Sequence, residues 1–550
     1  MLKLLTTLIF MVVCLFNAAA LDYNKNPIIG RADAPKGGTI TIGRTSYPRS
    51  LNFPISGDLS SKMVFELVVE NLCETNYQTG EVVPLLAKRW EVSSDGKVFT
   101  FYLNKKARFA DGTPVTAKDV QASWDIIHNP ANLIGGVRSD LNRFSKLEVV
   151  DQHTIKLHAK AARFSNITTL CYAFSVFSHK HYLADGKDFN KDFNTDIFGS
   201  GAYRVDKVKK GKLISLVRNK NYWGSNLPQN IGRYNFDRIN FKIVDNATVR
   251  YELFKSGKID MFAFSDAKRW ATETSSKKFK QQLLVAKKVE TQSPQKFRGI
   301  AINTRRKPFD DVRIRKAFAH TFDRKKFINK LFYGIYQPLN SYFPNSIFAS
   351  AGNAMIEFDL AQARKLLTAA GYTKINKDGL RVKDGKPLIA EYLYASKNQE
   401  RYLTIWKEDM RKVGIDIKLR LTTWATLMKH FHSKDFTFMF IGWGGDLNPD
   451  PHGMWHSKFR DTVSSSNLSG FTSQELDNLL VRVGSVFDRQ QRAKIFKRID
   501  SLLFENHPFI LGWSINFIRL GYRNKFSFIK GTAPKHGNFR SIWQYAWSME

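Results

Sequence analysis

The alternation of apolar and polar residues along the chain predicts helices and strands that follow one another throughout. Residues 90–103 predict a β-hairpin, because two alternating segments flank an Asp-Gly turn. Thr116 and, three residues later, Asp119 form the pattern of a capping box, which predicts a helix that begins there and ends before Pro130. The first third of the chain therefore already mixes α and β structure.

The second half of the chain shows the same mixture. Asp359 and Gly371 bracket a helical pattern as its N-cap and its C-terminal stop. Four more elements are predicted: a helix from Leu403 to Val413 that stops at Gly414, strands at Ile415–Leu421 and Phe436–Ile441, and a long helix at Asp488–Phe504. The sequence has no repeat with a period of about 20–50 residues. The predicted fold class is mixed α/β.

Length and charge limit the class of protein further. A chain of 550 residues is too long for one compact domain of about 100–200 residues, so we expect two or three lobes. Aromatic residues make up 13% of the chain, which excludes a disordered protein. The formal net charge is +36, spread over the whole chain. Such a charge favours anionic partners, yet a solvated positive surface is the simplest interpretation, and its meaning stays open.

The N-terminus predicts export. A basic start, an apolar run at Leu4–Phe16 and an A-x-A site that ends at Ala20 are typical of a secretory signal peptide, residues 1–20. Cys14 offers the alternative of a lipid-modified thiol, but Val13 precedes it where a small residue is expected. No later stretch reaches about 18 apolar residues. We therefore expect a protein of the periplasm that does not span the membrane.

Export bears on the two cysteines that remain, Cys73 and Cys171. In an oxidising compartment they could form one disulfide. They lie 98 residues apart in sequence, so a disulfide and two buried thiols both stay open. Export also argues against nucleic-acid binding, which the charge alone would suggest.

Five motifs follow one another along the chain: Pro84–Trp90, Phe109–Val120, Gly199–Arg204, Asn221–Gly224 and Pro308–Ala317. Together they resemble the bacterial family 5 extracellular solute-binding proteins, the peptide/nickel group. The resemblance runs from about Pro35 to Trp513. It implies a two-lobed periplasmic-binding-protein fold of type II, the Venus-flytrap type, which closes on its ligand and has an extra N-terminal subdomain.

The resemblance also implies a division of the chain. After the signal peptide, lobe I is expected to consist of residues 21–65, 200–290 and 510–550, the extra subdomain packed on it of residues 66–199, and lobe II of residues 291–509. In this arrangement the C-terminus returns to the first lobe.

Two further stretches, Asn221–Phe236 and Leu331–Ser346, resemble the branch of the family that binds oligopeptides and the peptide-nucleotide antibiotic microcin C. The resemblance implies a substrate-binding protein that captures oligopeptides, or peptide conjugates, and passes them to an inner-membrane ABC permease/ATPase complex. We expect a monomer with no cofactor and no nucleic-acid partner. Ligand identity, ligand length, affinity and the permease itself stay open.

The segment Phe438–Met454 holds the most informative chemistry. A predicted buried strand ends in Gly442–Asp446, and loops at strand ends carry the ligand sites of α/β proteins. Here Gly444 permits close backbone approach, Trp443 offers a flat apolar wall, and Asp446 offers a counter-charge for a cationic amine. The resemblance implies that Asp446 holds the α-amine of a peptide ligand beside Trp443. The alternative is that Asp446 caps a loop and Trp443 belongs to the core.

Other candidate residues lie on either side of this segment. Trp424 matches a tryptophan that lines a side-chain pocket in the family. Arg401 is a candidate for the ligand's carboxylate, although a solvated helix arginine is the simpler interpretation. His452 and His456 are four residues apart and near Asp450, a spacing that can hold zinc or nickel on a helix, as in relatives that bind nickel complexes. Neighbouring Pro and Gly residues argue against a regular helix, and we expect no metal site.

Enzyme signatures are missing from the sequence. It has no G-x-S-x-G nucleophile motif, no phosphate-binding loop that ends in Gly-Lys-Ser/Thr and no G-x-G-x-x-G. We therefore expect a binding protein without catalysis. Two alternatives are kept: a secreted hydrolase that acts on peptides or cell-wall fragments, and a receptor for a metal or metal chelate built around the histidine pair.

Overall fold

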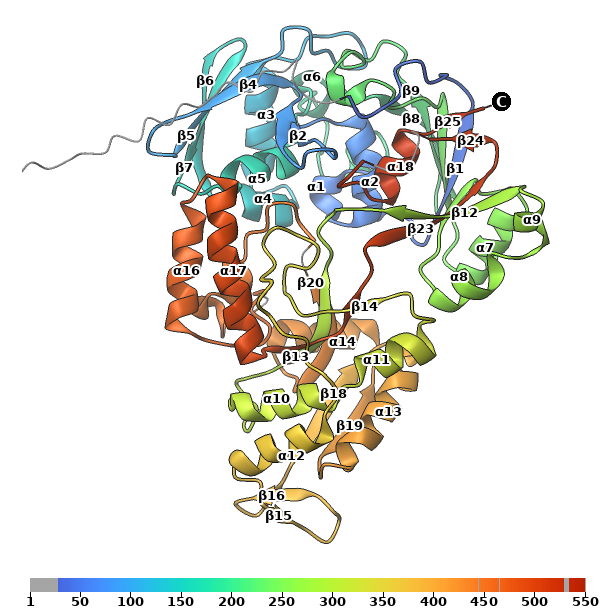
Figure 1. Cartoon of the computed structure of the whole chain (residues 1–550). Coiled ribbons are helices and arrows are strands. Elements are labelled where there is room, and N and C mark those ends of the chain that lie inside the picture. Colours follow the sequence, from blue (N-terminus) through green and yellow to red (C-terminus); the bar gives the residue numbers. More distant parts are fainter. Residues whose placement is uncertain (1–27, 444, 464, 529–533, 550) are drawn as a thin grey trace, which may run out of the picture.

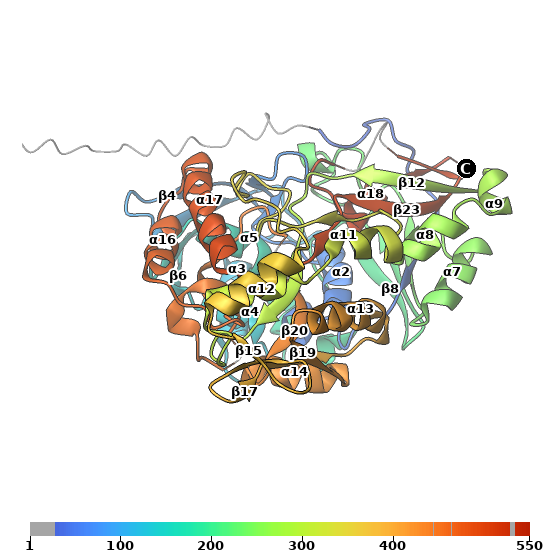
Figure 2. The same cartoon turned by 60° about the horizontal axis from the view of Figure 1, so that its bottom comes forward.

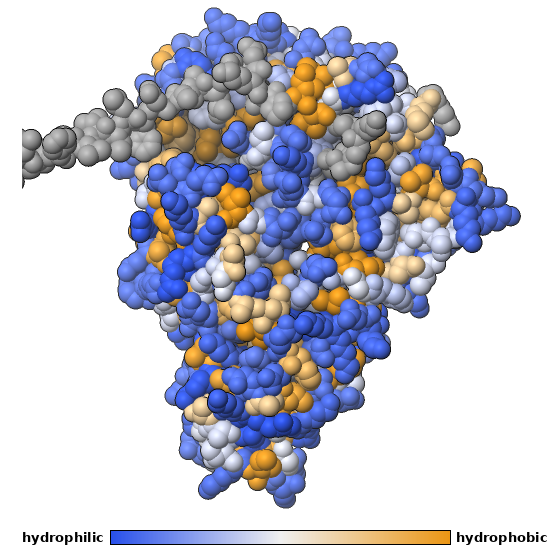
Figure 3. Space-filling view, in the orientation of Figure 1, coloured by the Kyte–Doolittle hydropathy of each residue, from blue (hydrophilic) through white to orange (hydrophobic). Residues whose placement is uncertain are grey.

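The structure is a computed structural model that describes residues 28–443, 445–463, 465–528 and 534–549. The predicted signal peptide and Gly444 lie outside the described residues. Three sheets organise the rest: a seven-stranded and a four-stranded sheet in the upper part of Figure 1, and a five-stranded sheet in the lower part. No helix in the described ranges is long and apolar enough to cross a membrane. In the space-filling view, hydrophilic residues cover most of the visible face and apolar residues form small groups (Figure 3).

The seven-stranded sheet combines three separate parts of the chain. Its strand order is β12-β23-β11-β1-β10-β9-β8. The strands are β1 (Thr39–Arg44), β8 (Tyr203–Lys209), β9 (Leu213–Arg218), β10 (Arg238–Ile243), β11 (Met261–Ala263), β12 (Leu284–Glu290) and β23 (Phe517–Arg523). β1 and β10 run parallel at the centre, where Ile40, Ile42 and Phe241 are buried. These three residues lie on one face of the sheet, so a strand from the N-terminus is held in place by burial of that face among elements from the middle and the end of the chain.

The four-stranded sheet lies beside the seven-stranded one and is entirely antiparallel. It has the order β4 (Ala87–Val92), β5 (Val98–Leu103), β7 (Thr154–Ala159) and β6 (Phe144–Asp151). The predicted hairpin at residues 90–103 is thereby confirmed. The capping box is also confirmed, because the Thr116 amide donates to the Asp119 carboxylate at the start of α3 (Ala117–His128). One continuous apolar core joins both sheets.

The two cysteines left open by the sequence form a disulfide. Cys73 lies on β2 (Cys73–Thr75) and Cys171 on α5 (Ser165–Ala173), and the bond joins these elements across 98 residues of sequence. Beside it, Asn71 donates a side-chain hydrogen bond to the Cys171 carbonyl, 2.6 Å away. The disulfide therefore fastens α5 to the start of β2, and the end of α2 (Leu59–Val68) belongs to the same apolar core.

The five-stranded sheet has the order β19-β18-β20-β13-β21. Its strands are β13 (Phe297–Ile302), β18 (Ile389–Tyr394), β19 (Asp416–Leu421), β20 (Phe438–Trp443) and β21 (Phe509–Leu511). β18 is parallel to both β19 and β20, while β13 is antiparallel to β20 and β21. Helices α10 (Val312–His320), α12 (Leu360–Ala369) and α13 (Glu400–Arg411) accompany this sheet in the lower part of Figure 1. The predicted N-cap Asp359 is confirmed, with its side chain accepting from the amide of Gln362.

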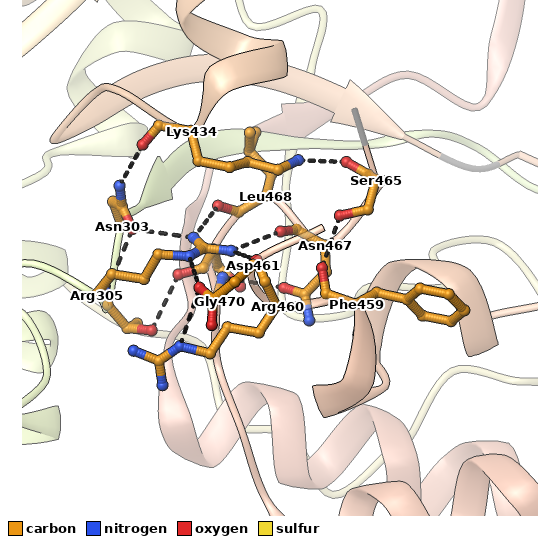
Figure 4. A network of polar contacts seen from close by, with 12 residues as sticks. Asn303, Arg305, Lys434, Phe459, Arg460, Asp461, Ser465, Asn467, Leu468 and Gly470 are labelled. Carbon is orange, nitrogen blue, oxygen red and sulfur yellow. Dashed lines mark hydrogen bonds and ion pairs between the residues drawn. The ribbon is translucent and has the colours of Figure 1, made fainter. Parts of the chain in front are cut away.

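Two features of the lower part of the molecule link segments that are distant in sequence. Helices α16 (Gln474–Gly484) and α17 (Arg489–Asn506) reach from the five-stranded sheet towards α5 and β7 (Figures 1 and 2). Arg305, which follows β13, anchors the loop before α16 by donating to the carbonyls of Leu468, at 3.0 Å, and Asn467, at 3.1 Å, as Figure 4 shows. Its Nε also pairs with Asp461 at 3.1 Å. One guanidinium thus supplies hydrogen bonds to loop carbonyls, as backbone amides do in helices and strands.

Candidate ligand-binding site

The residues that the sequence singled out lie at one edge of the five-stranded sheet. Because β18, β19 and β20 are parallel, their carboxyl ends share an edge, which we call the carboxyl edge. Trp443 ends β20 and Asp446 follows it. Trp424 begins α14 (Trp424–Ser433) three residues after β19, and Arg401 lies in the first turn of α13 after β18.

The carboxyl edge faces the seven-stranded sheet. β13 begins at Phe297, which pairs with Trp443, and residues 291–296 connect it to β12. β21 ends at the same edge, since Leu511 pairs with Gly299, and residues 512–516 lead from it towards β23. Both connections between the two sheets therefore leave from the edge that carries the candidate residues.

Trp443 forms part of the core and part of the wall of the site. Its indole packs against Phe431 of α14 with ring centroids 5.7 Å apart. Its Nε1 is buried and has no hydrogen-bond partner in the described part of the chain. Leu427 and Phe431 form the buried stripe of α14, and Trp424 extends this stripe into solvent with 67% of its surface exposed. The helix thus presents one packed and one open aromatic group at the carboxyl edge.

Glycine is required at the turn that leads to Asp446. Gly445 has φ of 94°, a left-handed conformation that suits glycine. A Cβ atom there would lie 3.1 Å from the carbonyl oxygen of Pro294, in the connection between the two sheets. The turn is therefore pressed against residues 294–296, which brings Asp446 close to Lys296. Gly444, the other glycine predicted for the site, lies outside the described residues.

The Asp446 carboxylate has no hydrogen-bond or ion-pair partner among the described residues. The residue is exposed to water, yet nearby protein groups partly desolvate its carboxyl and raise the pKa. The positive charges of Lys62 and Lys296 act in the opposite direction. A partly desolvated, unpaired carboxylate at the junction of two sheets is suited to a cationic ligand group, which would supply the missing partner.

Sequence reasoning missed Lys62. This residue lies on α2, in the part of the molecule that holds the seven-stranded sheet, and only 5% of its surface is exposed. Its Nζ lies 3.3 Å from a carboxylate oxygen of Glu66 and 2.8 Å from the ring centroid of Tyr172. A lysine among the apolar residues Met63, Val64 and Phe65 was the only signal in the sequence, and it is unspecific.

No contact in the described ranges places Arg401 at the site. Its guanidinium lies over the ring of Phe332, 5.4 Å from the centroid, and the residue is exposed. In the described ranges it makes no contact with the loop that carries Asp446. A role in binding the ligand's carboxylate therefore stays a prediction.

The histidine pair lies on a single helical turn, α15 (His452–Trp455), and just after it. The two rings are 4.8 Å apart. Burial and nearby positive charges lower the pKa of His452 to about 4. His456 Nδ1 accepts a hydrogen bond from the amide of Lys458 at 3.2 Å, and Asp450 accepts one from Ser165 at 2.9 Å. Within the described ranges, no group of three or more His, Cys, Asp or Glu side chains is arranged to hold a metal ion.

Comparison with known proteins decides the family. Residues 81–466 match the family model described as "Bacterial extracellular solute-binding proteins, family 5 Middle". The chain belongs to this family. The resemblance drawn from the five motifs is thereby confirmed, and so is the two-lobed fold expected from it.

Three similar proteins match this chain along most of its length. The uncharacterized protein YejA of Escherichia coli is 26% identical over 92% of this chain and 89% of its own length. The probable peptide-binding protein YejA of Agrobacterium fabrum is 25% identical over 86% of this chain and 83% of its own. The solved structure of the ABC transporter-associated periplasmic binding protein DppA of Helicobacter pylori, in complex with the peptide STSA, has a TM-score of 0.75 at 20% identity and covers 94% and 99% of the two chains.

Proposed function

We propose that this solute-binding protein is a periplasmic receptor that captures oligopeptides for an ABC importer. The observation that carries the proposal is the unpaired carboxylate of Asp446, exposed and partly desolvated, just after the end of β20 at the carboxyl edge. In the proposed complex, Asp446 holds the α-ammonium of an extended peptide, Trp443 and Gly444 lie along its backbone, and Trp424 covers a side chain. Hydrogen bonds to the peptide backbone give affinity, and tolerant pockets accept varied side chains.

The division of the chain is part of the same proposal. The proposed lobe I consists of residues 21–65, 200–290 and 510–550, the extra subdomain of residues 66–199, and lobe II of residues 291–509. Because Ile510 and Leu511 lie on β21 of the five-stranded sheet, the connection into lobe I begins after them. The two connections at the carboxyl edge support a hinge there, since the described chain crosses between the sheets only at residues 291–296 and 512–516, and within the second segment Trp513 and Ser514 are paired with β14 (Gln337–Pro338). A ligand that contacts both lobes stabilises the closed form, because the open form lacks half of those contacts.

The relatives support a peptide ligand. One relative is named as a probable peptide-binding protein, and the structural neighbour from Helicobacter pylori holds a peptide. The protein would be exported with cleavage after Ala20, act as a monomer, and deliver its ligand to an inner-membrane permease/ATPase complex. A metal-chelate receptor is less well supported, because the Nδ1 lone pair of His456 is already used.

Two measurements test the proposal. Mass spectrometry of small molecules released by denaturing the purified protein should detect peptides, and calorimetry with synthetic tri- to pentapeptides should then show binding. Metal analysis of the same sample and a turnover assay with a labelled peptide test the two alternatives. Release of a metal chelate without peptides, or hydrolysis of the labelled peptide, would contradict the proposal.

A further inference from the structure

A small polar cavity of about 140 Å³ lies in the part of the molecule that holds the seven-stranded sheet. Its walls come from the end of α2, from β2, from α5 and from the turn at Arg233 and Tyr234, and the disulfide forms part of them. Whole small ligands occupy pockets of about 300–1,000 Å³. This cavity has room for one long side chain, or for a few waters at about 30 Å³ each.

Several of the residues that line the cavity are glutamates, although the protein as a whole is strongly basic. Residues 63–87 contain four glutamates and no lysine or arginine, although the chain as a whole carries +36. Three of these glutamates, Glu66, Glu70 and Glu74, line the cavity. The lining also includes one basic residue, Arg233, so acidic residues outnumber basic ones there by three to one.

Two of the three glutamates have cationic partners in the protein. Glu66 pairs with Arg540 and, at 3.3 Å, with Lys62. Glu74 accepts from Arg233 at 3.2 Å through Oε2, while its Oε1 is buried and has no hydrogen-bond partner within the described ranges. One oxygen of a carboxylate that lines the cavity is therefore buried without a donor in the described ranges.

Glu70 has no cationic partner in the described part of the chain. Its side chain accepts from the hydroxyl of Tyr222 and from the indole of Trp223 at 2.8 Å, and only 6% of the residue is exposed. Burial raises the pKa of this carboxyl to about 7, and the charge of Glu74 acts in the same direction. The other titratable groups around it are Tyr222, which donates to it, and Tyr234 and Arg233 on the cavity wall.

The cavity lies next to the candidate site. Tyr172 lines the cavity, and the ammonium of Lys62 lies over its ring. Lys62 is one of the two lysines whose charge acts on Asp446. Tyr77, also in the wall, is three residues before Gly80, where a Cβ atom would lie 3.2 Å from the Leu447 side chain. Leu447 follows Asp446 directly, so the wall of the cavity reaches the loop that carries the proposed amine-binding carboxylate.

We propose that this cavity is a side-chain pocket for a lysine or arginine of the captured peptide. The inference rests on the proposed function, because it needs a peptide held at Asp446. The ammonium or guanidinium donates to Glu74 Oε1 and pairs with Glu70, and the rings of Tyr77, Tyr172 and Tyr234 surround the aliphatic stem and the charge. As the cation enters, Glu70 releases its proton to solvent, because a paired carboxylate keeps its charge in a buried site.

The test compares tripeptides that differ at one side chain. Lysine is placed at each position of a tri-alanine peptide, and norleucine, which has a similar length without the charge, replaces it in the matched control. At one position the lysine peptide should bind the wild type about 10- to 100-fold more tightly than the norleucine peptide, the range of a charge-assisted hydrogen bond. Calorimetry at pH 6.5 in buffers of different ionisation enthalpy should show proton release for that lysine peptide only.

Variants assign the effect to the cavity. Glu74→Gln and Glu70→Gln should each remove most of the preference for lysine and leave the norleucine peptide unaffected. Glu81→Gln, an exposed glutamate of the same acidic segment, should keep the preference. If Glu70→Gln fails to fold, Glu74→Gln and the proton release of the wild type still decide the question.

Equal affinity for lysine and norleucine peptides at all three positions of the wild type would overturn the inference and leave the proposed function intact. A lysine preference that survives Glu74→Gln, or that releases no proton, would place the cation elsewhere and equally overturn it. Absence of any peptide binding would contradict the proposed function itself.

Discussion

The carboxylate of Asp450 accepts a hydrogen bond from the hydroxyl of Ser165, 2.9 Å away, and joins parts of the chain that are 285 residues apart. Arg163 adds an ion pair to the same carboxylate at 3.8 Å. Next to it, the amide of Phe164 donates to the carbonyl of Gly484 at 3.0 Å. These contacts fasten the region of α16 and α17 to the start of α5, beside the candidate site.

This contact should influence closure of the protein. Asp450→Ala removes a bridge that exists only while the two parts touch, so the ligand-free protein should become more open. A partly exposed bond of this kind contributes about 0.5–1.5 kcal/mol, and peptide affinity should fall by roughly two- to tenfold, because closure then takes more of the binding energy. Small-angle scattering with and without peptide checks this. Asp435→Ala, which removes an exposed carboxylate of the same part that pairs with Arg306, is the control.

Asp446→Asn should weaken peptide binding strongly while stability changes little. The substitution keeps the size of the side chain and removes the charge that pairs with the α-ammonium. The loss should be about 2–5 kcal/mol, or roughly 1.5 to 3.5 decades in affinity. An acetylated peptide should bind the wild type poorly and lose little more in the variant.

Calorimetry on the four combinations of protein and peptide measures this coupling. Asp461→Asn, an exposed carboxylate that pairs with Arg305, serves as the matched control and should bind like the wild type. Equal binding of acetylated and free peptides by the wild type would show that Asp446 does not hold the amine.

Glu70 should make the protein less stable as the pH rises. Its pKa is raised from 4.5 to about 7 in the folded protein. Between these two values the unfolded chain has released the proton and the folded protein still holds it, so the free energy of unfolding falls with pH. The contribution of Glu70 is fully present below about pH 4.5, and about 3 kcal/mol is lost by pH 7 and above.

Denaturant unfolding of the ligand-free protein from pH 4.5 to 8 measures this effect. The difference between the wild type and Glu70→Gln should change with pH by about that amount, while Glu81→Gln should run parallel to the wild type. A constant difference between wild type and Glu70→Gln would contradict a raised pKa.

The disulfide should contribute substantially to stability. Its loop spans 98 residues, and in the chain-entropy model closing a loop of that length stabilises a protein by about 4–5 kcal/mol, with about 2–5 kcal/mol typical of natural bonds. The double variant Cys73→Ser/Cys171→Ser should therefore unfold at lower denaturant concentration. Thiol titration of the unreduced, unfolded mature protein should find no free thiol, and two free thiols would contradict the pairing.

The mature protein should begin at Leu21. The A-x-A site before it motivates cleavage after Ala20 and removal of Cys14 with the leader. Intact-mass analysis of protein recovered from the periplasm checks this. A lipid-modified Cys14 at the N-terminus would instead show an anchored receptor.

Local elements were predictable because their signals lie within a few residues of each other. The N-cap at Asp359 and the capping box at Thr116 were predicted correctly from side chains that bond to nearby amides. Boundaries were less exact: α13 ends at Arg411 instead of Val413, because the chain already turns towards Gly414, which has φ of 81°. The strand predicted at Phe436–Ile441 runs from Phe438 to Trp443, where pairing with β13 extends it.

The sequence by itself determined the family and the position of Trp443 and Asp446 at the end of a buried strand, because motifs and strand patterns are local in the chain. Only the tertiary structure decided that Cys73 meets Cys171, that Lys62 acts on Asp446, and that Glu70 meets Tyr222, 152 residues away. The physical reason is that burial and partner charges set the pKa and the role of a carboxyl group. These come from segments that are distant in sequence and meet only when the sheets assemble.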